Sequence, residues 1–237
     1  MNVETIGIIG YGHFGKFVHE LTTRFLPEVD VRVCTKDGTT PLESVASCDV
    51  VFLCVPISSY EEVLKDVLPH LGKDTVVVDV ATVKKHTSDL FRRHLADRAY
   101  VCCHPMFGAE SYKKTNGDVS GYRIVVTDST VEPEEYKTMQ SFLTKLGFIV
   151  IELSAEEHDR LLAETLFLTH YVGQTMKAGE FGRTVVDTVS FSSLMNAVEA
   201  VQNDDQLFAD VYTYNPYCKD VAARFHKAQE NVFKGLA

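Results

Sequence analysis

The sequence lacks the basic clusters and the long apolar runs that mark several classes of protein. Its 237 residues carry a formal net charge of −10, which would repel a phosphate backbone or an anionic membrane surface. We therefore expect no nucleic-acid partner and no membrane partner. No apolar run approaches the ~18 residues of a membrane-spanning helix, and no secretion signal precedes the first predicted strand. These absences favour a cytoplasmic protein.

Paired cysteines are also lacking. The six cysteines do not show the two-residue spacing typical of a zinc or iron–sulfur site, and most of them fall in apolar stretches. We expect them to be reduced core residues, and we expect no metal site. Apolar residues make up 45% of the chain and charged residues 24%, so the composition is that of an ordinary folded protein and does not indicate disorder.

A glycine-rich turn stands between a predicted strand and a predicted helix near the start of the sequence. Residues 5–9 are apolar, the glycines follow as Gly10-x-Gly12-x-x-Gly15, and apolar residues at helical spacing occupy positions 17–25. In such a turn the first glycine permits the bend, the second lets a pyrophosphate approach the backbone, and the third lets helix and strand pack closely. The alternative is a tight turn without a ligand, but the flanking elements supply the context that the motif needs. We predict a dinucleotide bound by Gly10, Gly12, His13, Phe14 and Gly15.

The residues after the second predicted strand, at positions 31–34, favour NADP over NAD. An acidic residue at this point would bind the ribose hydroxyls of NAD. The chain instead has Thr35 and Lys36, a hydroxyl and a cation that suit a 2′-phosphate. Asp37 follows, and a small shift in register would put its carboxylate at the ribose, so NAD is the alternative. The other interpretation of Lys36 is an exposed turn charge.

Predicted strands and helices alternate after this turn. Residues 50–55 and 75–80 are mainly apolar runs, as expected of parallel strands that are buried on both faces, and a helical pattern over residues 58–72 separates them. The alternation predicts the α/β class, with a doubly wound, Rossmann-type and mainly parallel sheet. Because ligands bind beyond the C-terminal ends of such strands, we add Pro56 and Ser58 to the predicted cofactor site. A helix cap would explain Ser58 equally well.

One histidine is held between a predicted strand and a rigid turn, within residues 103–108 (Cys-His-Pro-Met-Phe-Gly). The proline that follows His104 restricts it to extended conformations, and Gly108 lets the backbone turn back. Histidine has the side-chain pKa closest to neutrality, which suits a proton acceptor. A single histidine is more often a buried structural residue. His104, however, is predicted to share the ligand-binding edge of the sheet with the glycine turn, and this favours a catalytic role.

The pattern changes near Ser154. Strands predicted at residues 123–127 and 148–151 complete the sheet, and Ser154 then has capping-box spacing before a long helical pattern. We predict a dinucleotide-binding domain over residues 1–153 and a smaller, all-helical substrate and dimerisation domain over residues 154–237. A helical part this short has little core of its own, so we expect a homodimer formed through it.

Taken together, these motifs resemble the prephenate and arogenate dehydrogenase family of tyrosine biosynthesis. Besides the glycine turn, the resemblance rests on residues 79–84 (Asp-Val-Ala-Thr-Val-Lys), 104–108, 157–159 (Glu-His-Asp) and 167–170 (Phe-Leu-Thr-His). It covers nearly the whole chain. The form of residues 167–170 is most similar to the plant-type arogenate enzymes.

The resemblance implies an oxidative decarboxylation. A cyclohexadienol loses hydride from its hydroxyl-bearing ring carbon to the nicotinamide and expels carbon dioxide, which gives tyrosine from arogenate or 4-hydroxyphenylpyruvate from prephenate. His104 would accept the proton of the ring hydroxyl, and Thr82 would lie near the same hydroxyl, where the family commonly has serine. Lys84 and His170 match residues that the resemblance places at the substrate. Each has a plainer interpretation: a helix cap for Thr82, an exposed charge for Lys84 and a core residue for His170.

Two departures from the family pattern affect the substrate. Many members hold a substrate carboxylate with an arginine, yet residues 188–194 contain none, so Arg183 or Lys84 would have to replace it. Phe167 stands where some bacterial members have a further histidine. Arogenate has an amino-acid side chain and prephenate a keto-acid one, so the loss of a cation affects the two differently. We favour arogenate.

Two other functions stay open. Another two-domain NAD(P)-dependent reductase or hydroxyacid dehydrogenase would typically use a lysine of the helical domain, for which Lys177 is the candidate, and would leave His104 unexplained. A non-enzymatic NADP(H)-binding redox sensor would bind cofactor without turnover. His158 and Asp159 are interpreted as a structural hinge at the domain junction.

Overall fold

The computed structural model describes residues 3–35, 38 and 40–236. The chain divides into two compact units, Met1–His158 and Asp159–Ala237, a few residues beyond the predicted boundary at Ser154. Lys36, which was predicted to contact the cofactor, and its neighbour Asp37 lie outside the described residues.

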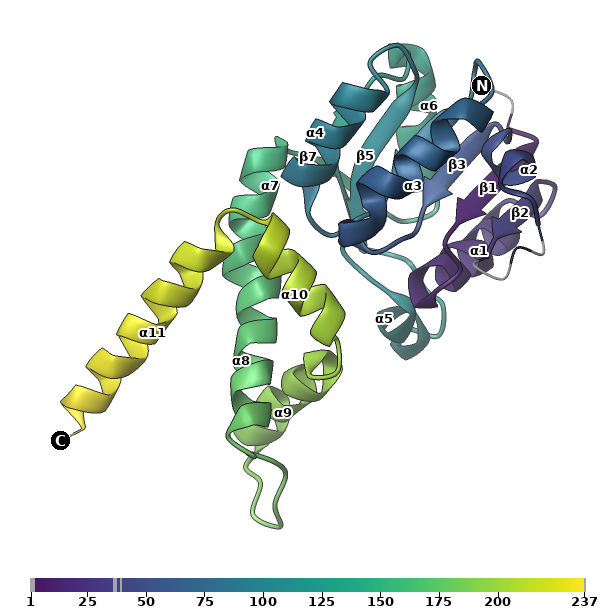
Figure 1. Cartoon of the computed structure of the whole chain (residues 1–237). Coiled ribbons are helices and arrows are strands. Elements are labelled where there is room, and N and C mark those ends of the chain that lie inside the picture. Colours follow the sequence, from purple (N-terminus) through teal and green to yellow (C-terminus); the bar gives the residue numbers. More distant parts are fainter. Residues whose placement is uncertain (1–2, 36–37, 39, 237) are drawn as a thin grey trace. The chain divides into compact units, whose positions relative to one another are not determined.

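The described residues of the first unit form one sheet of seven strands, in the order β2-β1-β3-β4-β5-β6-β7 (Figure 1). Neighbouring strands are parallel except β5 and β6, which are antiparallel. The predicted doubly wound, mainly parallel sheet is therefore confirmed. The strands are β1 Thr5–Ile9, β2 Asp30–Cys34, β3 Val50–Leu53, β4 Val76–Asp79, β5 Tyr100–Pro105, β6 Arg123–Ser129 and β7 Ile149–Glu152.

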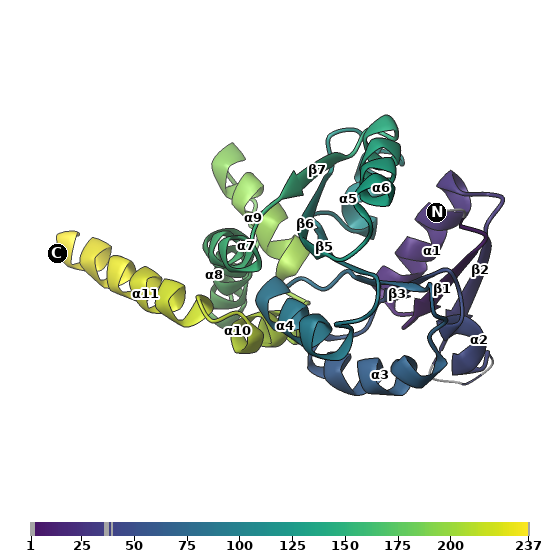
Figure 2. The ribbon, with the colours of Figure 1, turned by 90° about the horizontal axis from the view of Figure 1, so that it is seen from above.

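Helices cover both faces of this sheet (Figure 2). The connection from β1 to β2 runs in one direction along the sheet and the next three run in the other, so right-handed crossovers place their helices on opposite faces. One face carries α1 and α6, and the other carries α2, α3 and α4. The helices are α1 His13–Phe25, α2 Leu42–Ala46, α3 Tyr60–Val67, α4 Lys84–His94, the short α5 Ala109–Lys114 and α6 Pro133–Lys145, with 3-10 turns at Ile57–Ser59 (η1) and Leu68–His70 (η2).

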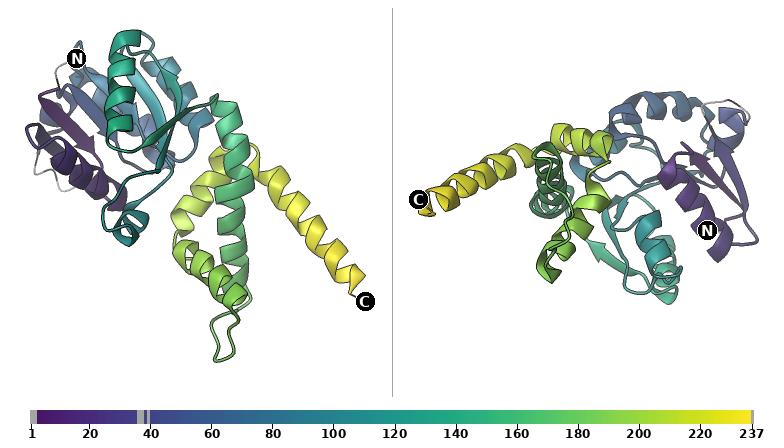
Figure 3. Two further views of the ribbon diagram at one scale, coloured as in Figure 1. Left: turned by 180° about the vertical axis from the view of Figure 1, so that it is seen from behind. Right: turned by 90° about the horizontal axis from the view of Figure 1, so that it is seen from below.

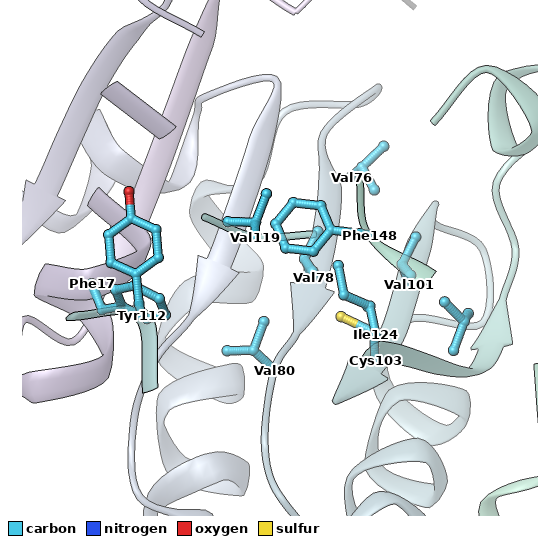
Figure 4. Close-up of a cluster of buried hydrophobic side chains, with 11 residues drawn as sticks. Phe17, Val76, Val78, Val80, Val101, Cys103, Tyr112, Val119, Ile124 and Phe148 are labelled. Atoms are coloured by element: carbon cyan, nitrogen blue, oxygen red, sulfur yellow. The ribbon is translucent and has the colours of Figure 1, made fainter. Parts of the chain in front are cut away.

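The core under α1 and α6 is built from alternate residues of the central strands. Val76 and Val78 of β4 and Val101 and Cys103 of β5 lie in one buried cluster with Phe17 of α1 (Figure 4). The residues between them on these strands are also buried, as expected of parallel strands covered on both sides. Burial raises the pKa of the Cys103 thiol to about 12, which keeps it protonated as a core residue. All six cysteines are free.

The second unit is helical, as predicted (Figure 3). The long helix predicted after Ser154 is present, and the Ser154 hydroxyl accepts a hydrogen bond from the Glu157 amide at 3.1 Å. A π-helical turn that the sequence pattern did not predict interrupts this helix. Here Phe167 stacks on Tyr171 and Phe208. The elements are α7 Ala155–Leu162, which crosses the division, the π turn η3 Ala163–Phe167, α8 Leu168–Ala178, α9 Val189–Val201, α10 Asp205–Tyr214 and α11 Cys218–Gly235.

A buried carboxylate at the end of β4 ties the first unit together. Asp79 Oδ1 accepts hydrogen bonds from the Tyr60 hydroxyl and the Ala81 amide, each at 2.8 Å. Its Oδ2 accepts from Lys84 Nζ and from the Thr87 hydroxyl, each at 2.6 Å. Asp79 and Lys84 are fully buried, so the ion pair is shielded from water. One side chain thereby links the end of β4 to α3 and α4.

The same lysine extends this network to β5. Lys84 Nζ also donates to the Cys103 carbonyl at 2.6 Å. Cys103 directly precedes His104, so the buried network fixes the backbone on which His104 stands.

We predict that Lys84→Met lowers the free energy of unfolding by about 3–5 kcal/mol, because the Asp79 carboxylate stays buried without its cation. The neighbouring Lys85 is the matched control, since its ion pairs with Asp89 and Glu156 are partly exposed. Lys85→Met should cost less than about 1 kcal/mol. Urea unfolding followed by circular dichroism measures both. Equal losses in the two variants would contradict a special role for the Asp79–Lys84 pair.

Candidate active site

Two of the three glycines of the turn are required by packing. Gly10 has φ +92°, and a Cβ there would overlap the carbonyl oxygen of Cys54 at the end of β3. A Cβ on Gly15 would overlap the carbonyl oxygen of Gly10 itself. These glycines hold the strand, the turn and α1 in close contact.

Gly12, by contrast, faces open space. An added Cβ would meet no described atom within 4 Å. Gly12 is the N-cap of α1, and among the described residues no side chain caps this helix and no acidic residue occupies its first turn. Its first backbone amides and the positive end of its dipole are therefore available to an anion. With His13 and Phe14 in the first turn, this cradle fits the pyrophosphate of a dinucleotide.

The other predicted cofactor residues follow β2 and β3. Pro56 and Ser58 come after β3 and are exposed. Ser58 lies inside the turn η1 and is not the N-cap of α3, so the helix-cap interpretation does not apply to it. Thr35 follows β2, and its hydroxyl oxygen is buried without a hydrogen-bond partner among the described residues. A buried polar atom of this kind needs a partner, which a ligand oxygen would supply.

Thr82 lies in the connection from β4 to α4. The N-cap of α4 is Val83, and within the described part of the chain α4 has no side-chain cap. The interpretation of Thr82 as a helix cap is thus not supported. Because Ala81 is held by Asp79, Thr82 stands on a fixed turn beyond the carboxyl end of β4. It is half-buried.

His104 is the second-last residue of β5 and is 6% exposed. Its Nδ1 lies 3.0 Å from Nε2 of His158, with the two rings edge to face. This contact uses Nδ1, and no described residue forms a hydrogen bond with Nε2. Burial, together with His158 and the positive charge of Lys84, moves the pKa of His104 well below its usual value. The ring is therefore neutral at physiological pH, as a proton acceptor must be.

Both cations predicted to hold substrate already have carboxylate partners. Lys84 is fully buried on Asp79 and would have to leave that ion pair to touch a ligand. In the second unit, Arg183 donates from Nε and Nη2 to the two carboxylate oxygens of Glu199, at 2.6 and 2.9 Å. This bidentate pair neutralises its guanidinium group.

His170 lies on α8 of the second unit and is buried. Its Nδ1 is shielded from solvent and has no partner in the part of the chain that the structure describes. Burial lowers its pKa, so the ring is neutral. A satisfied core histidine would have its ring nitrogens paired. Among the described residues, Nδ1 of His170 lacks such a partner.

Two important residues received no catalytic role from the sequence. Asp79 ends an otherwise apolar strand, and a charge in such a run requires a buried partner, which the sequence did not identify as Lys84. His158 was interpreted as a hinge, and it is the last residue of the first unit. Its contact with His104 spans 54 residues, so no local pattern could have revealed it.

The described residues contain neither a metal-binding cluster nor a membrane-spanning helix. No three histidine, cysteine, aspartate or glutamate side chains are grouped so that they could hold a metal ion. None of the helices there combines the length and the apolar character needed to cross a membrane.

A family model described as "Prephenate dehydrogenase, nucleotide-binding domain" matches residues 28–152. The match begins after the glycine turn, so the cofactor cradle at Gly12 rests on its own geometry. Arogenate dehydrogenase 2, chloroplastic, of Arabidopsis thaliana is 28% identical over 249 residues, which cover 98% of this chain and 69% of that protein. Arogenate dehydrogenase 1, chloroplastic, of the same plant is 29% identical, and the match covers 96% of this chain but 38% of that protein.

Among solved structures, a prephenate dehydrogenase from A. aeolicus in complex with hydroxyphenyl propionate and NAD+ is similar, with a TM-score of 0.75. The likeness covers 99% of this chain and 91% of that one, at 18% sequence identity. At this identity the likeness shows the fold.

The glycine turn gives a matched pair of variants. Gly12→Ala should weaken cofactor binding at least about tenfold, because its methyl group occupies the approach of the phosphates, and should leave stability nearly unchanged. Gly15→Ala should instead lower the free energy of unfolding by about 1–3 kcal/mol through overlap with the Gly10 carbonyl. Calorimetric titration and urea unfolding separate the two effects. If Gly12→Ala bound the cofactor as wild type does, the cradle would be wrongly placed.

Proposed function

This chain belongs to the prephenate dehydrogenase family, and we propose that it oxidises and decarboxylates a cyclohexadienol, arogenate or prephenate, with a nicotinamide dinucleotide as hydride acceptor. The observation that supports this most is His104, a buried neutral imidazole with its Nε2 unpaired. His104 lies near the end of β5, at the same edge of the sheet where the glycine turn leaves β1. A proton acceptor and a dinucleotide cradle at one edge suit the oxidation of an alcohol.

In this proposal His104 Nε2 takes the proton of the ring hydroxyl while hydride leaves the carbon that bears it. The bound nicotinamide supplies the hydride acceptor. Loss of the ring carboxylate as carbon dioxide makes the ring aromatic, and His104 returns the proton to the phenolate oxygen. Thr82 would donate to or accept from the same oxygen, and the Asp79–Lys84 network would hold both residues in place.

Arogenate is the favoured substrate. The two plant relatives are named arogenate dehydrogenases. Residues 188–194 contain no arginine, and Arg183 is paired with Glu199. Arogenate has its own ammonium group beside its carboxylate, so it depends less on a protein cation than prephenate does. We assign His170 to the substrate because its Nδ1 has no partner among the described residues.

NADP is the favoured cofactor, with NAD as the alternative. No acidic residue ends β2, and the buried hydroxyl of Thr35 follows it. Lys36 adds a positive charge in the sequence at this point. These groups suit a 2′-phosphate better than free ribose hydroxyls.

We further propose a homodimer formed through the helical unit. The C-terminal half of α11 exposes Val232 and Phe233, and Leu236 follows with its side chain in solvent. Apolar side chains exposed together on one helix are typical of a protein interface. Sedimentation at increasing concentration tests this, and a monomer throughout would contradict it. The cytoplasm is the proposed compartment, which the free cysteines suit.

The function is tested by incubating the pure protein with arogenate or prephenate and with NADP+ or NAD+, while nicotinamide absorbance is followed. We expect the highest kcat/KM with arogenate and NADP+. No turnover in all four combinations would overturn the proposal. Cofactor binding without turnover would point to the redox sensor instead.

The catalytic role of His104 gives a prediction about pH. Because the pKa of His104 is lowered, kcat/KM should stay level as pH falls through about 6.5 and decline only at lower pH, where Nε2 becomes protonated. His104→Asn should keep cofactor binding and reduce kcat by about 10²–10⁴-fold. Wild-type turnover in His104→Asn would refute this role. So would a wild-type kcat/KM that already declines above pH 7 as the pH is lowered.

A further inference from the structure

The contact between His104 and His158 joins two elements that are distant in sequence. His104 stands on β5 and His158 on α7, and both are nearly buried, at 6% and 3% exposed. Their Nδ1 and Nε2 atoms are 3.0 Å apart, a hydrogen-bond distance, and the ring centroids are 5.2 Å apart at 72°. Because both rings are held in place, one nitrogen of each is committed to the other.

A hydrogen bond between two neutral imidazoles has one proton and two arrangements. In the first, His104 Nδ1–H donates to His158 Nε2, so Nε2 of His104 carries a lone pair. In the second, His158 Nε2–H donates to His104 Nδ1, so Nε2 of His104 already carries a hydrogen. Only the first arrangement lets His104 Nε2 accept a proton.

We propose that His158 is a positioning residue that accepts the Nδ1–H of His104, and thereby fixes the tautomer and ring orientation in which His104 Nε2 is the base. The consequence for turnover rests on the proposed function, whereas the tautomer itself does not. When Nε2 takes up the substrate proton, Nδ1–H continues to donate to His158, so the imidazolium keeps a partner in a buried place.

The charges around the pair fit this arrangement. Lys84 is the cation that acts on His104, and it is held by Asp79. The positive charge of Lys84, the neighbouring ring of His158 and burial all lower the pKa of His104, so the resting His104 ring is neutral. Because Lys84 already places one cation near this ring, a second cation at His158 would oppose proton uptake, whereas a hydrogen-bond acceptor there would assist it.

The start of α7 is anchored so that His158 can act at a fixed distance. Ser154 caps the helix through the Glu157 amide. Glu156 forms an ion pair with Lys85 of α4 at 3.1 Å, which ties α7 to the helix that also carries Lys84. Residues of α4 therefore hold both partners of the contact: Lys84 binds the carbonyl before His104, and Lys85 pairs with the helix that carries His158.

The tautomer can be read without substrate, from long-range proton–nitrogen NMR spectra of histidine-labelled protein. Wild type should show His104 with a protonated Nδ1 and an unprotonated Nε2. His158→Phe keeps the volume but removes the acceptor, and should shift His104 toward the Nε2–H form. His158→Gln places an amide oxygen near the same point and should restore Nδ1–H. His94→Phe, at the far end of α4, is the matched control and should change nothing at His104.

Kinetics give the second readout. His158→Phe should lower kcat by about 10²-fold with KM and cofactor affinity unchanged, and His158→Gln should recover most of the loss. The proposal would be overturned if His104 carried its hydrogen on Nε2 in the wild type. It would also be overturned if His158→Phe still bound cofactor and left the His104 tautomer unchanged. If no substrate turned over while the tautomer behaved as described, the proposed function would fail and the positioning role would stand.

Discussion

The buried ion pair between Asp79 and Lys84 is the constraint on which the candidate site depends. Moving two charges out of water is costly, and such a pair adds little net stability compared with apolar residues of the same size. Its contribution here is to fix the position of the backbone around it. The four hydrogen bonds to the carboxylate, from Tyr60, Ala81, Lys84 and Thr87, leave one arrangement of the turn after β4. A further hydrogen bond of the network, from Lys84 to the Cys103 carbonyl, does the same for β5.

This network explains how groups from separate strands come to lie at one edge of the sheet with defined orientations. Thr82 follows the turn that Asp79 fixes, and His104 follows the carbonyl that Lys84 binds. The glycine turn reaches the same edge by a different means, through close contact between Gly10, Gly15 and the end of β3. Both devices place rigid backbone, not long side chains, where a ligand would bind.

Much of the first unit could be predicted from the sequence because its determinants are local. Apolar runs predict strands that are buried on both faces, and the order of strand, glycine turn and helix predicts the cradle at Gly12. The position of His104 followed from Pro105 and from the strand before it. Each of these features is determined by residues that are close to one another in the sequence.

The contacts that could not be predicted are the tertiary ones. Lys84 was expected at the substrate, but its spacing from Asp79 places both charges in one buried pair. His158 was expected to be a hinge, and its contact with His104 appears only when β5 and α7 are packed. Arg183 was one of two proposed substitutes for a missing arginine, and the fold places Glu199 beside it. In each case the partner of a charged or titratable group decides its role, and the fold selects that partner.

In the proposed reaction, His104 Nε2 meets the substrate hydroxyl at the edge of the sheet where the cofactor binds. A crystal structure of the protein with oxidised NADP and a 4-hydroxyphenyl analogue of the product tests it directly. We expect the phenolic oxygen to lie within about 3.2 Å of His104 Nε2, with the pyrophosphate on the amides after Gly12. A phenolic oxygen bound by another side chain, with His104 Nε2 remote from the ligand, would contradict it.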